Sequence, residues 1–130
     1  MAMTTEKIKI LLVSKNQRIA ESTQAVLAKE KDLNLVLRKM SQDNLFSVIN
    51  EERPEVILLD FDFQDRPFNL LDELTSRYPW IAVVAILSES RMENLERVIL
   101  SGARAFIQYP YQDVKLVITI KRVVQLIERN

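Results

Sequence analysis

Residues 56–60 read Val-Ile-Leu-Leu-Asp, four large apolar side chains followed by one carboxylate. A strand that helices cover on both faces is apolar at nearly every position, and such strands belong to parallel sheets. The stretch therefore predicts a central parallel strand. Its last residue, Asp60, would lie at the carboxyl edge of the sheet, where open α/β folds bind ligands and carry out chemistry.

Apolar runs also occur on both sides of this stretch, at residues 8–13, 33–40, 81–87 and 105–109. Segments of helical period separate the runs, near residues 17–30, 43–52, 67–78, 91–101 and 113–128. Alternating strands and helices predict parallel strands joined by right-handed crossovers. The runs at 33–40 and 105–109 are mixed in polarity, which suits sheet edges. The sequence thus predicts an α/β fold: a flavodoxin-like, doubly wound parallel sheet of five strands in the order 2-1-3-4-5, with five helices.

The composition predicts one domain over residues 1–130, with residues 1–6 as a flexible tail. Eighteen basic and eighteen acidic residues balance, and the basic residues are scattered, so we expect no nucleic-acid binding. The absence of Cys and His excludes disulfides, thiolate zinc sites, imidazole ligands and Ser-His triads. No apolar run approaches the roughly 20 residues of a membrane-spanning helix, so we expect no membrane insertion and a cytoplasmic location.

Several residues indicate where the helices begin and end. Pro67 suits a first helical turn, because its missing N–H has no helical partner there. Gly102, the only glycine in the chain, suits a left-handed residue after the fourth helix. We expect helix caps at Asn16, Asp43 and Asp65, and at Gln112 or Asp113.

The predicted strand order gathers several polar residues at one edge of the sheet. The first and third strands are neighbours, so their carboxyl ends bring Ser14, Lys15 and Asn16 close to Asp60 and Asp62. The ends of the fourth and fifth strands add Leu87, Ser88, Tyr109 and Pro110.

Over nearly its whole length the chain resembles the receiver domain of response regulators. The resemblance rests on the strand ending in Leu58-Leu59-Asp60, on Ser101-Gly102-Ala103 after the fourth helix, and on Tyr109-Pro110-Tyr111 after the fifth strand. Such receivers accept a phosphoryl group from a histidine kinase on an aspartate equivalent to Asp60. The resemblance therefore implies that Asp60 is the candidate phosphoacceptor.

The chain departs from the receiver pattern at most of the other positions that the resemblance implies. Ser14 and Lys15 stand in place of the acidic pair that helps to coordinate Mg²⁺. Leu87 replaces the hydroxyl residue that senses the phosphoryl group, and Ser88 comes one residue late. Tyr109 replaces the lysine before Pro110. The Met-Pro pair after the aspartate is replaced by Phe63-Gln64.

Phosphoryl transfer to a carboxylate requires Mg²⁺, because the incoming oxygens otherwise repel it. Lys15 would instead bring a fixed positive charge to the pocket. An ammonium group about 4 Å from Asp60 would contribute about 4 kcal/mol at an intermediate dielectric, before the cost of desolvation. We therefore hypothesise that Lys15 takes the electrostatic role of the metal and that the pocket holds no metal. Only if Asp60 is a working acceptor would Asp60 and Asp62 form a weak Mg²⁺ site.

Each of these residues also has a simpler interpretation. Asp60 could be a solvated strand-end carboxylate or accept N–H groups of the following turn. Lys15 could point into water, and Asp62 could be a surface residue. Ser88 is better interpreted as the cap of the fourth helix. For Tyr109 we expect a packed ring and a hydrated hydroxyl group.

The last helix supplies a candidate partner surface. Its core stripe comprises Leu116, Val117, Ile120, Val123, Val124 and Ile127. Val114 and Ile118 fall on another side, and Met92 on the fourth helix could join them. In receivers, the face made by the fourth helix, fifth strand and fifth helix is the usual partner surface. We expect a protein partner or a homodimer there, and core burial for Leu95 and Ile99.

The leading hypothesis is an atypical receiver, a signalling and protein-interaction module without enzymatic activity, cofactor or regulated phosphorylation. One alternative is a working receiver that is phosphorylated on Asp60 with Mg²⁺. A second is a small-ligand-binding domain of flavodoxin-like fold, although Ser14-Lys15-Asn16-Gln17 contains no glycine to wrap a phosphate.

Overall fold

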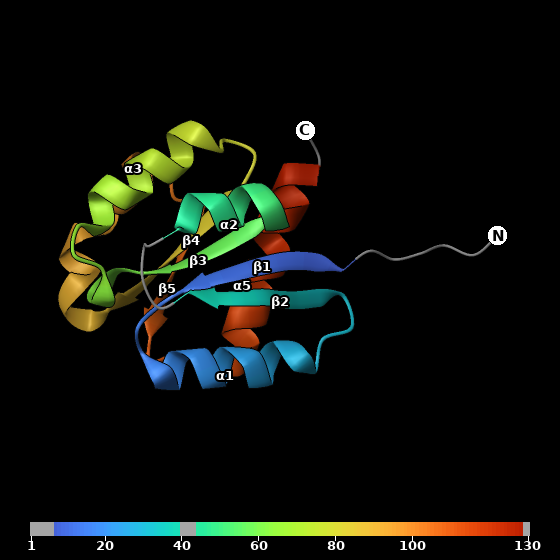
Figure 1. Cartoon of the computed structure of the whole chain (residues 1–130). Coiled ribbons are helices and arrows are strands. Elements are labelled where there is room, and N and C mark those ends of the chain that lie inside the picture. The colour runs from blue at the N-terminus through green and yellow to red at the C-terminus, as the bar shows by residue number, and fades with distance from the viewer. Residues whose placement is uncertain (1–6, 40–43, 129–130) are drawn as a thin grey trace.

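The computed structural model describes residues 7–39 and 44–128, and over these residues one sheet of five parallel strands forms in the order β2-β1-β3-β4-β5 (Figure 1). This order confirms the predicted flavodoxin-like fold. The strands are β1 (Ile8–Val13), β2 (Leu33–Lys39), β3 (Val56–Asp60), β4 (Ala82–Ser88) and β5 (Ala105–Tyr109). The predicted tail at residues 1–6 and the predicted cap at Asp43 lie outside the described residues.

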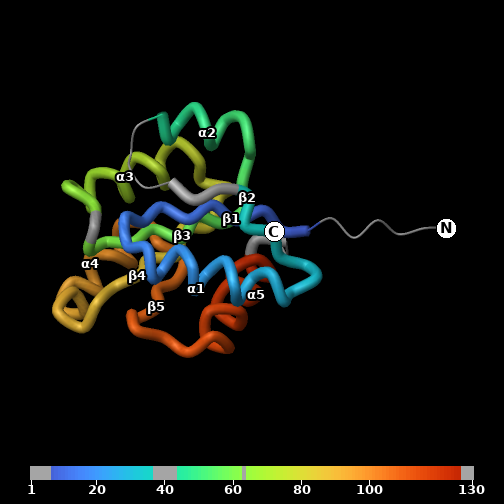
Figure 2. The backbone as a smooth tube through the Cα atoms, turned by 60° about the horizontal axis from the view of Figure 1, so that its bottom comes forward, coloured from blue at the N-terminus to red at the C-terminus, as the bar shows by residue number. Residues whose placement is uncertain are grey.

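Helices cover both faces of the sheet. They are α1 (Gln17–Ala28), α2 (Leu45–Glu52), α3 (Pro67–Arg77), α4 (Leu95–Leu100) and α5 (Asp113–Glu128). Side chains of α1 and α5 pack on one face, and side chains of α2, α3 and α4 pack on the other. Figure 2 shows α2 and α3 on the opposite side of the strands from α5. Two 3₁₀ segments, η1 (Phe61–Phe63) and η2 (Glu89–Asn94), follow the carboxyl ends of β3 and β4.

The central strand shows why the sequence stretch at 56–60 is apolar. Every residue of β3 is buried. Leu58 packs with α1 and α5, whereas Ile57 and Leu59 pack with α2, α3 and α4. Because successive side chains of a strand point to opposite faces, a strand between two helical layers has no position for a solvated side chain. Asp60 therefore ends β3 inside the protein rather than at its surface.

The helix starts confirm part of the sequence prediction. Asn16 caps α1, because its side-chain oxygen accepts hydrogen bonds from the N–H groups of Arg18 and Ile19. Pro67 opens α3 as predicted, but the cap position is Arg66, without a side-chain cap bond, so the prediction for Asp65 was wrong. The Gln112 carbonyl accepts the first N–H groups of α5. The fourth helix begins at Leu95 instead of near residue 91, because residues 89–94 form η2.

Gly102 has the left-handed conformation expected after α4, with φ of 107°. A β-carbon at this position would lie 2.9 Å from Thr75 Cγ2. Both the backbone angle and the close approach of α3 require glycine here. Across the described part of the chain, no helix is both long enough and apolar enough to span a bilayer.

Candidate functional site

The site is built around Asp60, which is only 1% exposed at the end of β3. Its Oδ2 atom accepts a hydrogen bond of 2.6 Å from the Ser14 hydroxyl group, which follows β1. Its Oδ1 atom accepts the main-chain N–H of Asp62 at 3.1 Å, which caps η1. The Ser14 oxygen in turn accepts the N–H of Asn16 at 3.0 Å. Both carboxylate oxygens of Asp60 are thus bonded to the loops that begin at its own strand and at the neighbouring strand.

Burial raises the pKa of Asp60 above its ordinary value, because desolvation disfavours the charged form. The hydrogen bonds from Ser14 and from the Asp62 N–H act in the opposite direction, as does the positive charge of Arg91. The negative charge of Asp62 adds to the rise. The balance favours a proton on this carboxyl group more than on an ordinary aspartate.

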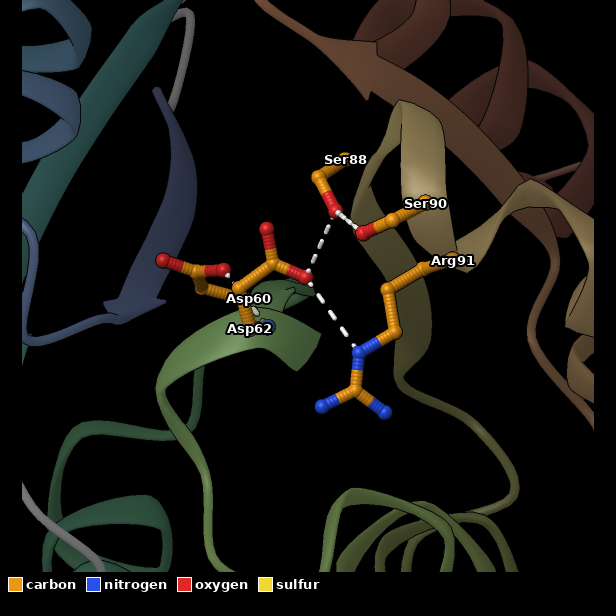
Figure 3. Close-up of polar contacts among 5 residues, drawn as sticks. All are labelled: Asp60, Asp62, Ser88, Ser90 and Arg91. Atoms are coloured by element: carbon orange, nitrogen blue, oxygen red, sulfur yellow. Dashed lines mark hydrogen bonds and ion pairs between the residues drawn. The ribbon is translucent and has the colours of Figure 1, made fainter.

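Asp62 is the second carboxylate of the site, and it holds the loop that follows β4 (Figure 3). The Ser88 hydroxyl group donates to Asp62 Oδ1 at 3.0 Å, and Arg91 Nε lies 3.4 Å from the same oxygen. Ser88 Oγ is also 3.0 Å from Ser90 Oγ. Because the single hydroxyl proton of Ser88 goes to Asp62, Ser90 must donate to Ser88. The carboxyl ends of β3 and β4 are thereby joined through side chains of η1 and η2.

The cation of this site is Arg91 rather than Lys15. Lys15 is exposed, and among the described residues no ion pair joins it to Asp60. The structure therefore gives no support to the hypothesis that Lys15 replaces a metal, and it agrees with the simpler interpretation that Lys15 points into water. No spacing in the sequence could have identified Arg91, because a regular helix was predicted where the 3₁₀ segment η2 brings this side chain back to Asp62.

The chain resembles known proteins in its structure but not detectably in its sequence. No family model matches the sequence, and no curated protein matches it. The receiver domain of NtrX from Brucella abortus has a TM-score of 0.79 and 24% identity, covering 89% of this chain and 98% of that one.

Two further solved structures extend the match. The N-terminal signal receiver domain of a two-component system response regulator from Bacteroides fragilis has a TM-score of 0.81 and 28% identity, over 88% of this chain and 93% of that chain. A CheY-like response regulator receiver domain protein from Methanospirillum hungatei JF-1 has a TM-score of 0.84 and 22% identity, over 95% and 98%. The chain therefore has the fold of the receiver domains of response regulators.

The side chains at the end of β4 are not placed as the receiver resemblance implied. Leu87 is fully buried and packs with the helices of the α2–α4 layer, so its side chain does not line the site. Ser88, the next residue, presents its hydroxyl group to Asp62. Ser88 makes no side-chain cap bond, so its interpretation as a helix cap was wrong. One residue of offset places the hydroxyl group on Asp62 instead of beside Asp60.

Tyr109 of the receiver domain is half-buried at the end of β5, and its ring packs against the core as expected. The ring meets that of Tyr111 edge to face, with centroids 5.7 Å apart. Tyr111 Oη lies 3.2 Å from the oxygen of the buried Thr23 on α1. Pro110 is exposed and follows a cis peptide bond. The pairing of Thr23 with Tyr111 was not predicted, because it depends on how α1 meets the connection between β5 and α5.

The predicted partner surface of the receiver domain is partly exposed. Val114 and Ile118 on α5 are 59% and 45% exposed. Ile99 on α4 is 43% exposed, which contradicts its predicted burial, because α4 begins later and turns Val98 instead toward the core. Met92 and Leu95 are half-buried against the core.

Proposed function

We propose that this chain is an atypical receiver domain that acts in cytoplasmic two-component signalling by binding a protein partner. It has no enzymatic activity of its own and is not regulated by phosphorylation of Asp60. The observation that carries this proposal is the 2.6 Å hydrogen bond from Ser14 to Asp60 Oδ2.

This hydrogen bond affects phosphorylation because it occupies an oxygen of Asp60, the group that would attack the phosphorus atom. To accept a phosphoryl group, a carboxylate must offer an ionised oxygen to the incoming phosphorus. Both oxygens of Asp60 already accept hydrogen bonds, and burial raises the pKa of the group. A larger protonated fraction makes a weaker nucleophile. The burial of Asp60, together with the occupation of both its oxygens by hydrogen bonds, therefore opposes the chemistry that its position in the fold suggests.

The side chains around Asp60 do not fit a Mg²⁺ site. Magnesium prefers a near-octahedral set of oxygen ligands that includes one or more carboxylates. Asp62 Oδ1 accepts from Ser88 and faces the guanidinium group of Arg91, so a cation would have to compete with both. Ser14 occupies the side of Asp60 where the receiver pattern has its acidic pair. We therefore infer that the domain works without a metal.

The partner surface in this proposal is the face formed by α4, β5 and α5. Six large apolar side chains among the described residues of these elements are at least one-third exposed: Ile99, Leu100, Phe106, Val114, Ile118 and Leu126. Leu100, at 78%, is the most exposed of them. Exposed apolar side chains that gather on adjacent elements are typical of protein-interaction surfaces. This face supports a contact with a partner protein or with a second copy of the domain.

Intact-mass spectrometry after incubation with acetyl phosphate and Mg²⁺ tests the proposal. The wild-type protein should gain no phosphoryl adduct, and Asp60→Asn provides the matched control. A receiver with a complete acidic pair, treated in parallel, shows that the reagent is active. An adduct on the wild-type protein that Asp60→Asn abolishes would establish the second candidate function, a working phosphoacceptor.

A further inference from the structure

A hollow of about 680 Å³ lies at the edge of the sheet opposite Asp60. Its lining residues come from the end of α2, from the connection between α2 and β3, and from the connection between α3 and β4. Its volume is within the range of small-ligand and peptide-anchor sites. The receiver chemistry around Asp60 plays no part here, so an inference about this hollow does not rest on the proposed function.

Trp80 forms one wall of the hollow and is 64% exposed. Its ring meets that of Tyr78 edge to face, with centroids 5.8 Å apart, and the Tyr78 ring stacks on Phe46 at 6.3 Å. The Tyr78 hydroxyl group donates to Asn50 Oδ1 at 3.0 Å, which fixes the ring. A rigid aromatic platform with one large, exposed ring has the composition of a binding hot spot.

Two arginine side chains lie near Trp80. Arg53 lines the same hollow, and Arg104 lines a second one of about 220 Å³ beyond Pro79 and Ile81. Arg104 donates to the Pro79 carbonyl oxygen, and in the described part of the chain neither arginine forms an ion pair. Glu55 is the one acidic residue that lines the larger hollow. Two guanidinium groups therefore stand against one carboxylate near Trp80, which leaves a net positive charge for an anion.

The backbone of Arg53 has a conformation that is unusual for arginine. Arg53 ends α2 with φ of 51°, and its N–H bonds to the Ile49 carbonyl group. Glycine or asparagine is the usual residue in this left-handed position, because a β-carbon is disfavoured there. The chain instead places a long cation at the rim of the hollow.

We propose that the surface formed by Trp80, Tyr78, Arg53 and Arg104 binds an acidic peptide segment of a partner protein. An apolar side chain of that segment enters the hollow beside Trp80 and Tyr78, above Ile49 and Ile81, which line its floor. Carboxylates on either side of it pair with Arg53 and Arg104, since guanidinium groups bind carboxylates in a bidentate manner. Charge complementarity selects this occupant over a basic or uncharged one.

A library of random linear peptides, selected on the wild-type domain with Trp80→Ser protein as soluble competitor, tests this proposal. Selected peptides should share an aliphatic or aromatic residue flanked by Asp or Glu. Trp80 is the only tryptophan in the chain, so its emission reports on this surface alone. Binding of a selected tryptophan-free peptide should shift that emission, and Asp→Asn and Glu→Gln versions of the peptide should bind about tenfold more weakly.

Arg53→Gly is the matched variant, because glycine suits the left-handed backbone and removes only the side chain. It should lower peptide affinity about tenfold, whereas Arg18→Ala, which removes an exposed arginine side chain on α1, should leave the affinity unchanged. Circular dichroism establishes that each variant is folded. Failure to select any peptide, selection of basic peptides, equal binding by Arg53→Gly, or a dimer that depends on Trp80 in sedimentation equilibrium would each overturn the proposal. Asp60→Asn should bind the peptides normally, which separates this result from the fate of the proposed function.

Discussion

The two edges of the sheet treat their polar side chains in opposite ways. At the carboxyl edge, Ser14 bonds to Asp60, while Ser88 and Arg91 satisfy Asp62. At the other edge, Trp80 is exposed, and Arg53 has no ion pair within the described residues. At the edge that carries Asp60, the polar side chains bond to one another, whereas at the opposite edge Trp80 and the guanidinium group of Arg53 can still bind a partner.

The two edges differ in how many of their polar and aromatic groups are available to bind a ligand. A buried polar group that already has its partners gains little from a ligand, because each new contact must replace an existing one. None of the buried side-chain nitrogen and oxygen atoms among the described residues lacks a hydrogen bond. Exposed aromatic and guanidinium groups lose only water on binding. The polar contacts at the carboxyl edge should therefore matter for stability, and those at the opposite edge for recognition.

The largest change in stability should come from introducing the acidic pair of the receiver pattern at positions 14 and 15. The double variant Ser14→Asp, Lys15→Asp places a second carboxylate beside Asp60 and removes the 2.6 Å hydrogen bond. Like charges at this distance in a buried site should lower the free energy of unfolding by about 2–4 kcal/mol without metal. Mg²⁺ should recover most of that loss, because it would bind the new carboxylate pair.

Urea unfolding with Mg²⁺ and with EDTA measures both effects. The wild-type protein should show equal stability in the two conditions, and the double variant should not. Stabilisation of the wild-type protein by Mg²⁺ would contradict the inference that Asp60 and Asp62 fail to form a metal site.

A smaller loss is expected from Ser14→Ala, which leaves Asp60 Oδ2 buried without its donor. An unsatisfied buried acceptor costs about 1–3 kcal/mol in the free energy of unfolding. Ser90→Ala is the control, because Ser90 is exposed and should change stability by no more than about 0.5 kcal/mol. Urea unfolding of both variants gives the comparison, and equal stabilities would show that the Ser14 contact contributes nothing to the fold.

Asp60 should contribute to the pH dependence of the free energy of unfolding. Its pKa is raised in the folded protein, so the folded state binds more protons than the unfolded state between the unfolded value near 3.8 and the folded value. Stability that Asp60 contributes is therefore present below this window and declines as pH rises through it. Asp60→Asn removes the titration, so the wild-type protein should lose stability relative to this variant as pH rises from 4 toward neutrality. The opposite trend in paired urea titrations would mean that the pKa of Asp60 is lowered.

The sequence predicted the fold because the apolar stretches report directly on burial. A run such as residues 56–60 can be satisfied only between two helical layers, and mixed runs mark the edges. Asp60 was located for the same reason, since it ends such a run. The partners of Asp60 within the site were harder to predict. Ser14 was recognised as a neighbour of Asp60, but the contact of Arg91 depends on η2, a local 3₁₀ conformation that periodicity does not encode.

The exposed fraction of individual apolar side chains also could not be predicted from the sequence. Ile99 was predicted to be buried, and it is 43% exposed. Its burial depends on one or two residues of helix phase, which the apolar periodicity of the sequence does not fix.

The smallest effects on stability should come from Arg91→Ala, at the carboxyl edge of the sheet, and from Trp80→Ser, at the opposite edge. The two variants should differ in hydrogen exchange and in peptide binding. The Arg91–Asp62 pair is partly exposed, with side chains 34% and 26% accessible, so its loss should cost about 0.2–1 kcal/mol and less at high salt. Trp80→Ser removes a side chain that is 64% exposed and should cost no more than about 1 kcal/mol.

Hydrogen exchange then distinguishes these two variants. Arg91→Ala should speed amide exchange in η2, because Asp62 no longer holds that segment through Arg91. Trp80→Ser should leave η2 unchanged and abolish binding of acidic peptides. If Arg91→Ala also weakened peptide binding, the two edges would be energetically coupled, and the closed edge would regulate the open one instead of standing apart from it.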